Sequence, residues 1–353
     1  MSVFGEKELK AHLKSDEIGG LYLIYGTESY TKDFYAEKLK EKAVSADFAD
    51  FNYHFFDGTQ CTMQDIEQAV EAFPMMSSTS CVFVKDMPID NMSAAEVKDL
   101  EPFLSDVPDY CALIFFLGKT DPAIRKNEKA KRSFALFEKY GRVFELNKKT
   151  ASELSKLIIS GVHKRGSDIS RQNADYLVDT VGDDMTVIFN EVEKLSAYAT
   201  GREITRNDID LLSIKTLEAT AFDLAKYIVS DNFEKAYSVL DILFSQKADE
   251  MMIMGAVISA FVDLYRVKIA VAAGHRAEKP AEIFQYRGRE FRLRNASRST
   301  ASLSVSALRK CLDELHNADM KLKSTAVDNR LVMEEMLVKL ILVIESEKGQ
   351  VSR

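Results

Sequence analysis

The fold is decided near the N-terminus by residues 21–33, which read LYLIYGTESYTKD. The five apolar residues from Leu21 to Tyr25 form a run typical of a buried strand, and a short polar loop follows them directly. The loop leads into a segment with a helical pattern. Gly26 and Lys32 occupy the first glycine and the lysine of the phosphate-binding pattern GxxxxGK[ST]. The stretch therefore predicts the strand–loop–helix unit of a P-loop fold.

Two residues of this loop depart from a working nucleotide site. Thr31 replaces the second glycine, and Asp33 replaces the hydroxyl residue that would bind Mg²⁺. A carboxylate about 4 Å from a phosphate oxygen costs roughly 4 kcal/mol at an effective dielectric near 20. The next predicted strand that could carry an acidic pair ends in Lys85-Asp86 instead. We therefore predict a degenerate phosphate loop that does not bind ATP, at Gly26, Thr31, Lys32 and Asp33; an ordinary strand–turn–helix is the alternative.

Further apolar runs extend this unit into an α/β region. The expected strands are 21–25, 51–56, 81–84, 111–117 and 143–146. Segments of helical pattern lie between them, near 29–44, 62–73, 94–105 and 121–139. Strands that alternate with helices favour a parallel sheet with helices on both faces. The sequence thus predicts a parallel five-stranded sheet in an α/β N-terminal domain.

The remainder of the chain has the pattern of an all-α protein. Five of the six prolines lie at or before Pro122, and only Pro280 follows. Helices are expected at 150–165, 170–181, 184–199, from 205 onward, and finally at 328–348. We expect an α/β domain at 1–147 and two all-α domains at 148–214 and 215–353.

Composition excludes several classes of protein. The 353 residues are 46% hydrophobic and 29% charged, which is typical of a globular protein with more than one core. The longest apolar run, Cys111–Leu117, is far shorter than the roughly 18 residues of a membrane span. Residues 1–10 lack the apolar stretch of a signal peptide, and no pair of the four cysteines has CxxC spacing. We expect a cytoplasmic protein with reduced cysteines and no membrane contact.

No catalytic or metal-binding pattern stands out. The five histidines form no HExxH, and there is no GxSxG or cysteine–histidine signature. We predict no catalytic residue, no metal and no cofactor.

One segment is basic in an otherwise acidic chain. The net charge is −8, but residues 266–310 contain 11 lysines and arginines against three glutamates. Aromatic residues Tyr286 and Phe291 are interleaved with the arginines, as in surfaces that contact phosphates. A solvated charged face, or ion pairs with a neighbouring chain, would explain these arginines equally well. The possible DNA or subunit contacts are Arg287, Arg289, Arg292, Arg294 and Arg298.

A short apolar segment at the end of a predicted helix has two interpretations. It reads Phe73-Pro-Met-Met76 and is followed by Ser77-Ser-Thr-Ser80. Methionine is unbranched and polarizable, which suits an adaptable protein-binding surface. Periodicity alone favours Met75 and Met76 as core residues under the sheet. The four small polar residues that follow are also compatible with an exposed position for the two methionines.

Taken together, these features resemble the delta subunit of the bacterial DNA polymerase III clamp loader. The resemblance covers about residues 4 to 346 and rests on the order and spacing of four segments. These are Leu21-Tyr-Leu-Ile-Tyr-Gly-Thr-Glu28, the passage 74–84, Asn190-Glu-Val-Glu-Lys-Leu195 and Asp319-Met-Lys-Leu-Lys-Ser324. The resemblance implies an AAA+-like domain with a degenerate nucleotide site, a helical lid and a C-terminal helical collar.

The resemblance also implies a function and partners. A delta subunit binds the beta sliding clamp and opens it for loading onto primed DNA, without hydrolysing ATP itself. Its other partners are the motor (tau/gamma) and delta-prime subunits, and primer–template DNA through the complex. It is then an accessory subunit of the polymerase holoenzyme with no catalysis of its own. The clamp-binding element of the family maps onto Phe73, Pro74, Met75 and Met76, where methionines replace a bulkier apolar pair.

Two other functions remain open at this stage. One is an active P-loop ATPase with a divergent loop, which requires Asp33 and the missing acidic pair to be tolerated. The other is a helical DNA-binding protein without a clamp partner, whose DNA affinity would fall steeply with salt.

Overall fold

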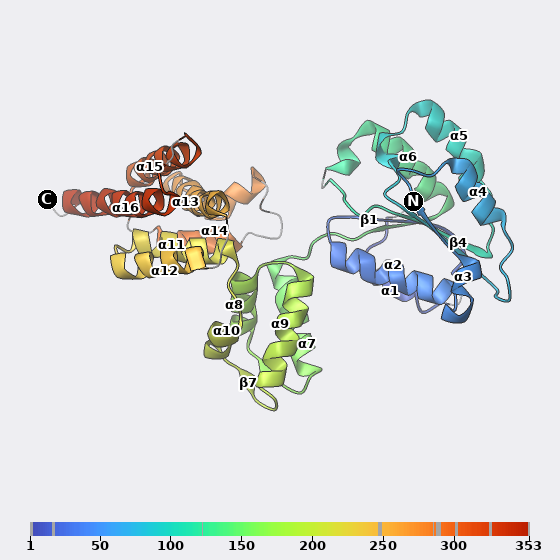
Figure 1. Cartoon of the computed structure of the whole chain (residues 1–353), viewed down its shortest axis with the longest axis horizontal. Coiled ribbons are helices and arrows are strands. Elements are labelled where there is room, and N and C mark those ends of the chain that lie inside the picture. Colours follow the sequence, from blue (N-terminus) through green and yellow to red (C-terminus); the bar gives the residue numbers. More distant parts are fainter. Residues whose placement is uncertain are drawn as a thin grey trace. The chain divides into compact units, whose positions relative to one another are not determined.

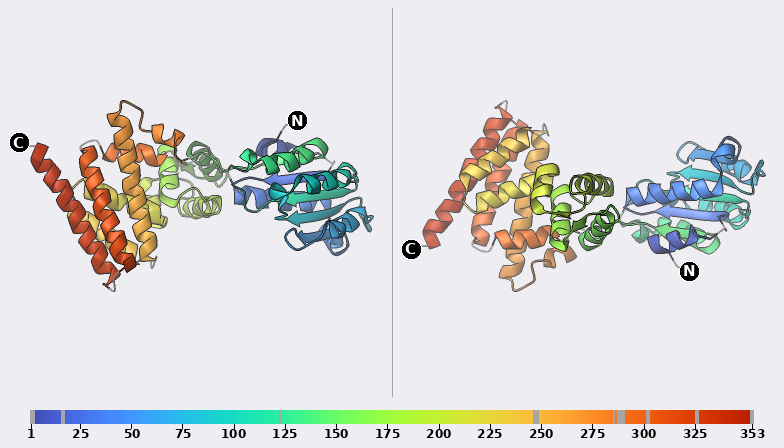
Figure 2. Two further views of the ribbon diagram at one scale, coloured as in Figure 1. Left: turned by 90° about the horizontal axis from the view of Figure 1, so that it is seen from above. Right: turned by 90° about the horizontal axis from the view of Figure 1, so that it is seen from below.

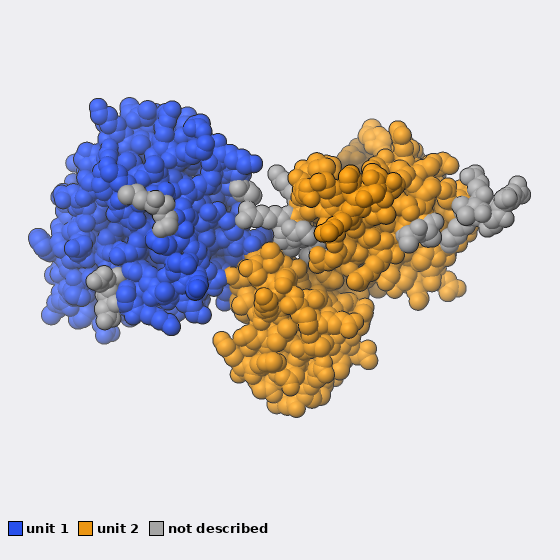
Figure 3. Space-filling model, turned by 180° about the vertical axis from the view of Figure 1, so that it is seen from behind, with its two compact units in different colours: residues 1–148 blue, residues 149–353 orange. Residues whose placement is uncertain are grey.

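The computed structural model divides the chain into two compact units, residues 1–148 and 149–353 (Figure 3). It describes residues 3–15, 18–121, 123–245, 249–284, 286, 291–300, 303–324 and 327–351. The first unit is α/β and the second is almost entirely helical (Figure 1). The finer division at residue 214 stays a prediction.

The first unit is built on a five-stranded sheet in which every pair of neighbouring strands is parallel. Its strands are β1 (Gly20–Tyr25), β2 (Tyr53–Asp57), β3 (Ser80–Lys85), β4 (Cys111–Phe116) and β5 (Arg142–Glu145). They lie in the order β2-β3-β4-β1-β5, which places β1 beside β4 and β5. The predicted sheet is therefore confirmed.

Helices cover both faces of this sheet (Figure 1). They are α1 (Glu6–His12), α2 (Ser29–Ala43), α3 (Ala49–Asn52), α4 (Met63–Glu71), α5 (Ala94–Ser105) and α6 (Glu128–Tyr140). Leu21 and Leu23 of β1 join the core with α4, α5 and α6, whereas Tyr22 and Ile24 join the core with α1 and α2. Successive side chains of a strand point to opposite faces. A strand buried on both faces therefore needs an unbroken apolar run.

Two predicted boundaries in this unit are wrong. The strand expected from residue 51 begins at Tyr53, because 49–52 form the helical turn α3. The helix expected from residue 121 begins at Glu128, after a short 3-10 turn, Ile124–Lys126. The side chain of Asn127 accepts a hydrogen bond from the Lys129 N–H, and an N-cap of this kind fixes where a helix starts.

The second unit begins with four helices. They are α7 (Ala151–His163), α8 (Arg171–Val181), α9 (Met185–Tyr198) and α10 (Arg206–Leu212). Each begins at a serine, threonine or aspartate whose side chain accepts a hydrogen bond from the first turn. Two short parallel strands, β6 (Asp168–Ile169) and β7 (Glu203–Ile204), pair between them. The sequence did not predict these strands, because two residues are too few to show a period.

Six further helices surround one apolar core in the described part of the second unit. They are α11 (Leu217–Val229), α12 (Phe233–Ser245), α13 (Glu250–Ala272), α14 (Phe291–Ser299), α15 (Val305–Ser324) and α16 (Asn329–Val351). Helices α15 and α16 lie side by side and pack against the others (Figure 2). None of the helices in the described ranges is long and apolar enough to cross a membrane.

Candidate functional site

The segment Phe73-Pro74-Met75-Met76, called here the methionine turn, is exposed at the edge of the sheet where the strands begin. It follows α4, which ends at Glu71, and precedes the first residue of β3. The exposed fractions are 79% for Phe73, 56% for Met75 and 84% for Met76. The interpretation of the two methionines as core residues is therefore wrong. Helix α4 buries Ile66 and Val70 instead, one turn apart on its inner face.

Two side chains from other elements hold the methionine turn. The amide of Asn52, at the end of α3, donates to the Met75 carbonyl at 2.8 Å and accepts from the Met75 N–H at 2.7 Å. The ring of Tyr110, just before β4, stacks on Phe73 with 4.9 Å between ring centroids. Sequence analysis missed both Asn52 and Tyr110. Neither belongs to a motif, and their proximity to the turn follows from the strand order β2-β3-β4.

The phosphate-like loop lies at the opposite edge of the sheet, where the strands end. Three of its backbone N–H groups are already engaged by the protein itself. Those of Gly26, Thr27 and Glu28 donate to Thr120 Oγ1, Asn147 Oδ1 and the Leu146 carbonyl, at 3.2, 3.2 and 3.0 Å. A phosphate cradle needs such N–H groups pointing at the ligand. In this chain they join the loop to the residues that follow β4 and β5.

Lys32 is completely buried beneath the loop. Its Nζ donates to the carbonyls of Leu117 and Gly118, both at 2.7 Å, and lies 5.6 Å from the centre of the Phe116 ring. Burial lowers the pKa of Lys32 from its ordinary 10.5, and nearby carboxylates, including Asp33, oppose that shift. The ammonium group therefore stabilises the end of β4 and is not presented to a ligand.

The other residues of the degenerate loop are placed as follows. Thr31 is buried, whereas Asp33 is exposed on the first turns of α2. Gly26 has φ +129°, and a Cβ there would lie 2.1 Å from the Leu146 carbonyl oxygen. Glycine is therefore required by close backbone packing, whether or not phosphate binds. Asp86, after β3, accepts a hydrogen bond from the Gly118 N–H at 2.5 Å.

The arginines of the basic segment fall into three groups. Arg287 and Arg289 lie outside the described residues. Arg294 and Arg298 are exposed on α14. Arg292 instead forms an ion pair with the buried Asp263 of α13 at 2.8 Å. A DNA or subunit contact of this set stays a prediction, and its exposed described members are Arg294 and Arg298.

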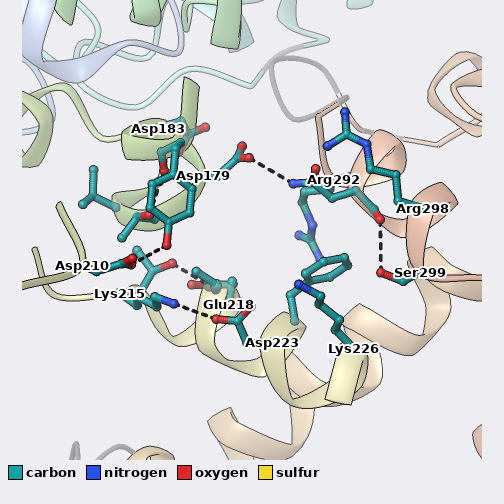
Figure 4. A pocket seen from close by; sticks show the side chains of 18 of the residues that line it. Asp179, Asp183, Asp210, Lys215, Glu218, Asp223, Lys226, Arg292, Arg298 and Ser299 are labelled. Carbon is teal, nitrogen blue, oxygen red and sulfur yellow. Dashed lines mark hydrogen bonds and ion pairs between the residues drawn. The ribbon is translucent and has the colours of Figure 1, made fainter. Parts of the chain in front are cut away.

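The second unit also contains a cavity of about 690 Å³ between α8, α11 and α14 (Figure 4). Several of its polar side chains contact one another. Asn295 donates to Asp179 at 3.1 Å, and Lys215 contacts Asp223 at 2.8 Å. Burial raises the pKa of Asp179. Acidic and basic groups line the cavity together, so its charge selects neither anions nor cations. Across the described ranges, no three His, Cys, Asp or Glu side chains are grouped to hold a metal ion.

Comparisons with known proteins agree with this architecture along the chain. A family model described as "DNA polymerase III, delta subunit" matches residues 22–147. A second, described as "DNA polymerase III delta subunit, C-terminal domain", matches residues 218–340. DNA polymerase III subunit delta of Bacillus subtilis is 23% identical over 93% of this chain and 95% of its own length. A probable subunit delta from Aquifex aeolicus is 22% identical over 74% of each chain.

A solved structure gives the same result at the level of the fold. The Bacillus subtilis DNA clamp loader delta protein superposes with a TM-score of 0.64 at 22% identity, covering 95% of this chain and 99% of that one. The similarity thus extends over the α/β unit and the helices after it, and the predicted α/β domain followed by all-α structure is confirmed. The chain belongs to the DNA polymerase III delta subunit family.

Proposed function

We propose that this chain binds the beta sliding clamp through the methionine turn and opens it for loading onto primed DNA. The observation that carries the proposal is the exposure of the adjacent residues Met75 and Met76, which are 56% and 84% exposed. Adjacent exposed methionines form an adaptable apolar contact that could fill a pocket on a partner. Family membership supplies the identity of that partner.

Opening follows from differential binding. A ligand shifts a conformational equilibrium only by the difference between its affinities for the two states. Burial of two methionine side chains contributes roughly 3–6 kcal/mol, which is about 10²–10⁴ in affinity. If the turn and its neighbours fit the opened clamp interface better than the closed one, this free energy favours the open state.

The proposal includes no ATP hydrolysis by this chain. Its support is the engagement of the Gly26, Thr27 and Glu28 N–H groups within the protein and the burial of Lys32. ATP-driven work then belongs to the motor (tau/gamma) subunits, which this chain joins together with delta-prime in a cytoplasmic complex. Primer–template DNA is reached through that complex, with Arg294 and Arg298 as the exposed candidates for a contact.

The first prediction tests clamp binding directly. We expect the purified chain to bind the sliding clamp of its own organism without nucleotide. Replacing both methionines, Met75→Ala and Met76→Ala, should weaken binding about 10²-fold or more, because the buried apolar area is lost. Surface plasmon resonance measures both affinities, and circular dichroism checks that the variant is folded.

A matched control comes from a second pair of adjacent methionines. Met251 and Met252 on α13 are 40% and 62% exposed, so Met251→Ala/Met252→Ala removes the same atoms from another surface. Its clamp affinity should equal that of the wild type. Equal affinities for the wild type and the Met75/Met76 variant would show that the clamp does not bind at the methionine turn. ATP binding that depends on Lys32 would favour the divergent ATPase instead.

A further inference from the structure

Asn52 is the one residue in the described part of the chain that hydrogen-bonds to the backbone of the methionine turn. Asn52 is 1% exposed. The amide makes one bond as donor and one as acceptor with the same residue, at 2.8 and 2.7 Å. This arrangement imitates a pair of strands exchanging N–H and C=O groups. It also provides hydrogen-bond partners for the buried Asn52 amide, whose burial without partners would be destabilising.

The turn needs such an external support. Met76 has φ +53°, in the left-handed region that residues with a side chain seldom adopt. Pro74 has no N–H to donate, and α4 has already ended at Glu71. A conformation of this kind persists when its surroundings determine it. Here the surroundings are the Asn52 amide at Met75 and the Tyr110 ring at Phe73.

We infer that Asn52 is a positioning residue that holds Met75 and Met76 in the conformation that meets the clamp. The inference rests on the proposed function. Two exposed methionines on a free loop would lose conformational entropy when bound, whereas a turn fixed beforehand does not. A side-chain amide is suited to this role because it provides a donor and an acceptor in one plane. Aspartate at the same position would keep an acceptor, lose the donor and face the Met75 carbonyl with a second oxygen.

The test combines Asn52→Ala with the double methionine variant in a thermodynamic cycle. In the wild-type background, Asn52→Ala should weaken clamp binding about tenfold or more, because two hydrogen bonds no longer fix the turn. In the Met75→Ala/Met76→Ala background the same substitution should change affinity less than about twofold. Clamp concentrations must be high enough to measure the weakened variants. Asn173→Ala is the matched control, since Asn173 also donates its amide to a backbone carbonyl, at 3.0 Å, far along the chain.

Hydrogen exchange of the free chain gives a readout that does not need the clamp. The Met75 N–H donates to Asn52, so its exchange should be slow in the wild type and about tenfold or more faster in Asn52→Ala. Amides of β3, Ser80–Lys85, should not change, which shows that the sheet is intact. Mass spectrometry with residue-level fragmentation resolves the two.

Each outcome decides the inference. Unchanged affinity for Asn52→Ala, or an equal loss in both backgrounds, would overturn it. If the double methionine variant binds the clamp as tightly as wild type, the proposed clamp site fails. Exchange at Met75 then still shows whether Asn52 holds the turn, and unchanged exchange contradicts that. Should Asn52→Ala fail to fold, Asn52→Asp takes its place in the same cycle, since it keeps the side-chain volume and removes the donor.

Discussion

Lys32 places a buried ammonium group against the carbonyls of Leu117 and Gly118, in a loop whose spacing suggests nucleotide binding. Lys32→Met keeps a side chain of similar length but removes the ammonium donor, so both carbonyls lose their hydrogen bond from residue 32. We predict that the free energy of unfolding falls by about 1–3 kcal/mol at neutral pH while clamp affinity stays unchanged. Chemical denaturation measures the first quantity. Lys38→Met, on the exposed side of the same helix, should stay within about 0.5 kcal/mol of wild type.

The difference in stability between the wild type and Lys32→Met should depend on pH. Burial lowers the pKa of Lys32 in the folded chain below the 10.5 of an exposed lysine. Between those two values the unfolded chain holds the proton and the folded chain has released it, so stability rises with pH. Methionine does not titrate. The stability advantage of the wild type over Lys32→Met should therefore grow as pH rises toward 10.5, and a shrinking advantage would contradict the assignment.

At the scale of elements, α14 is attached to α13 by a buried ion pair. Arg292 contacts Asp263, which is 2% exposed and also accepts a hydrogen bond from the Tyr286 hydroxyl. Removing one partner of a buried pair leaves an uncompensated charge, and this typically costs about 3–5 kcal/mol. Arg292→Ala should destabilise the second unit by that amount, as measured by chemical denaturation. Arg294→Ala, an exposed neighbour on the same helix, is the control and should change stability by about 0.5 kcal/mol or less.

The elements also show what a sequence can predict. The buried strands were predictable because a strand covered on both faces needs an unbroken apolar run, as Leu21 to Tyr25 provide. The methionine turn was located as a segment, but its exposure depends on tertiary packing that periodicity does not describe. Asn52 and Tyr110 were unpredictable, because they meet the turn only through the order of β2, β3 and β4. The engaged loop amides likewise depend on Thr120 and Asn147, each far from the loop in sequence.

At the scale of the whole molecule, the α/β unit presents two chemically different edges of one sheet. At one edge, the N–H groups and the lysine of a nucleotide-like loop are used for internal structure. At the other, an apolar turn is exposed and hydrogen-bonded to Asn52. Under the proposed function, the effect of the chain on the clamp is set by its relative affinities for the open and closed states.

The most direct test of the proposed clamp opening is the release of a sliding clamp from circular DNA by the chain alone, without ATP. Labelled clamp is loaded on a closed circle, the chain is added, and gel filtration separates DNA-bound from free clamp over time. We predict that the wild-type chain accelerates release, and that the Met75→Ala/Met76→Ala variant leaves the spontaneous rate unchanged. A wild-type chain that binds the clamp yet does not accelerate its release would contradict the proposal that binding opens the ring.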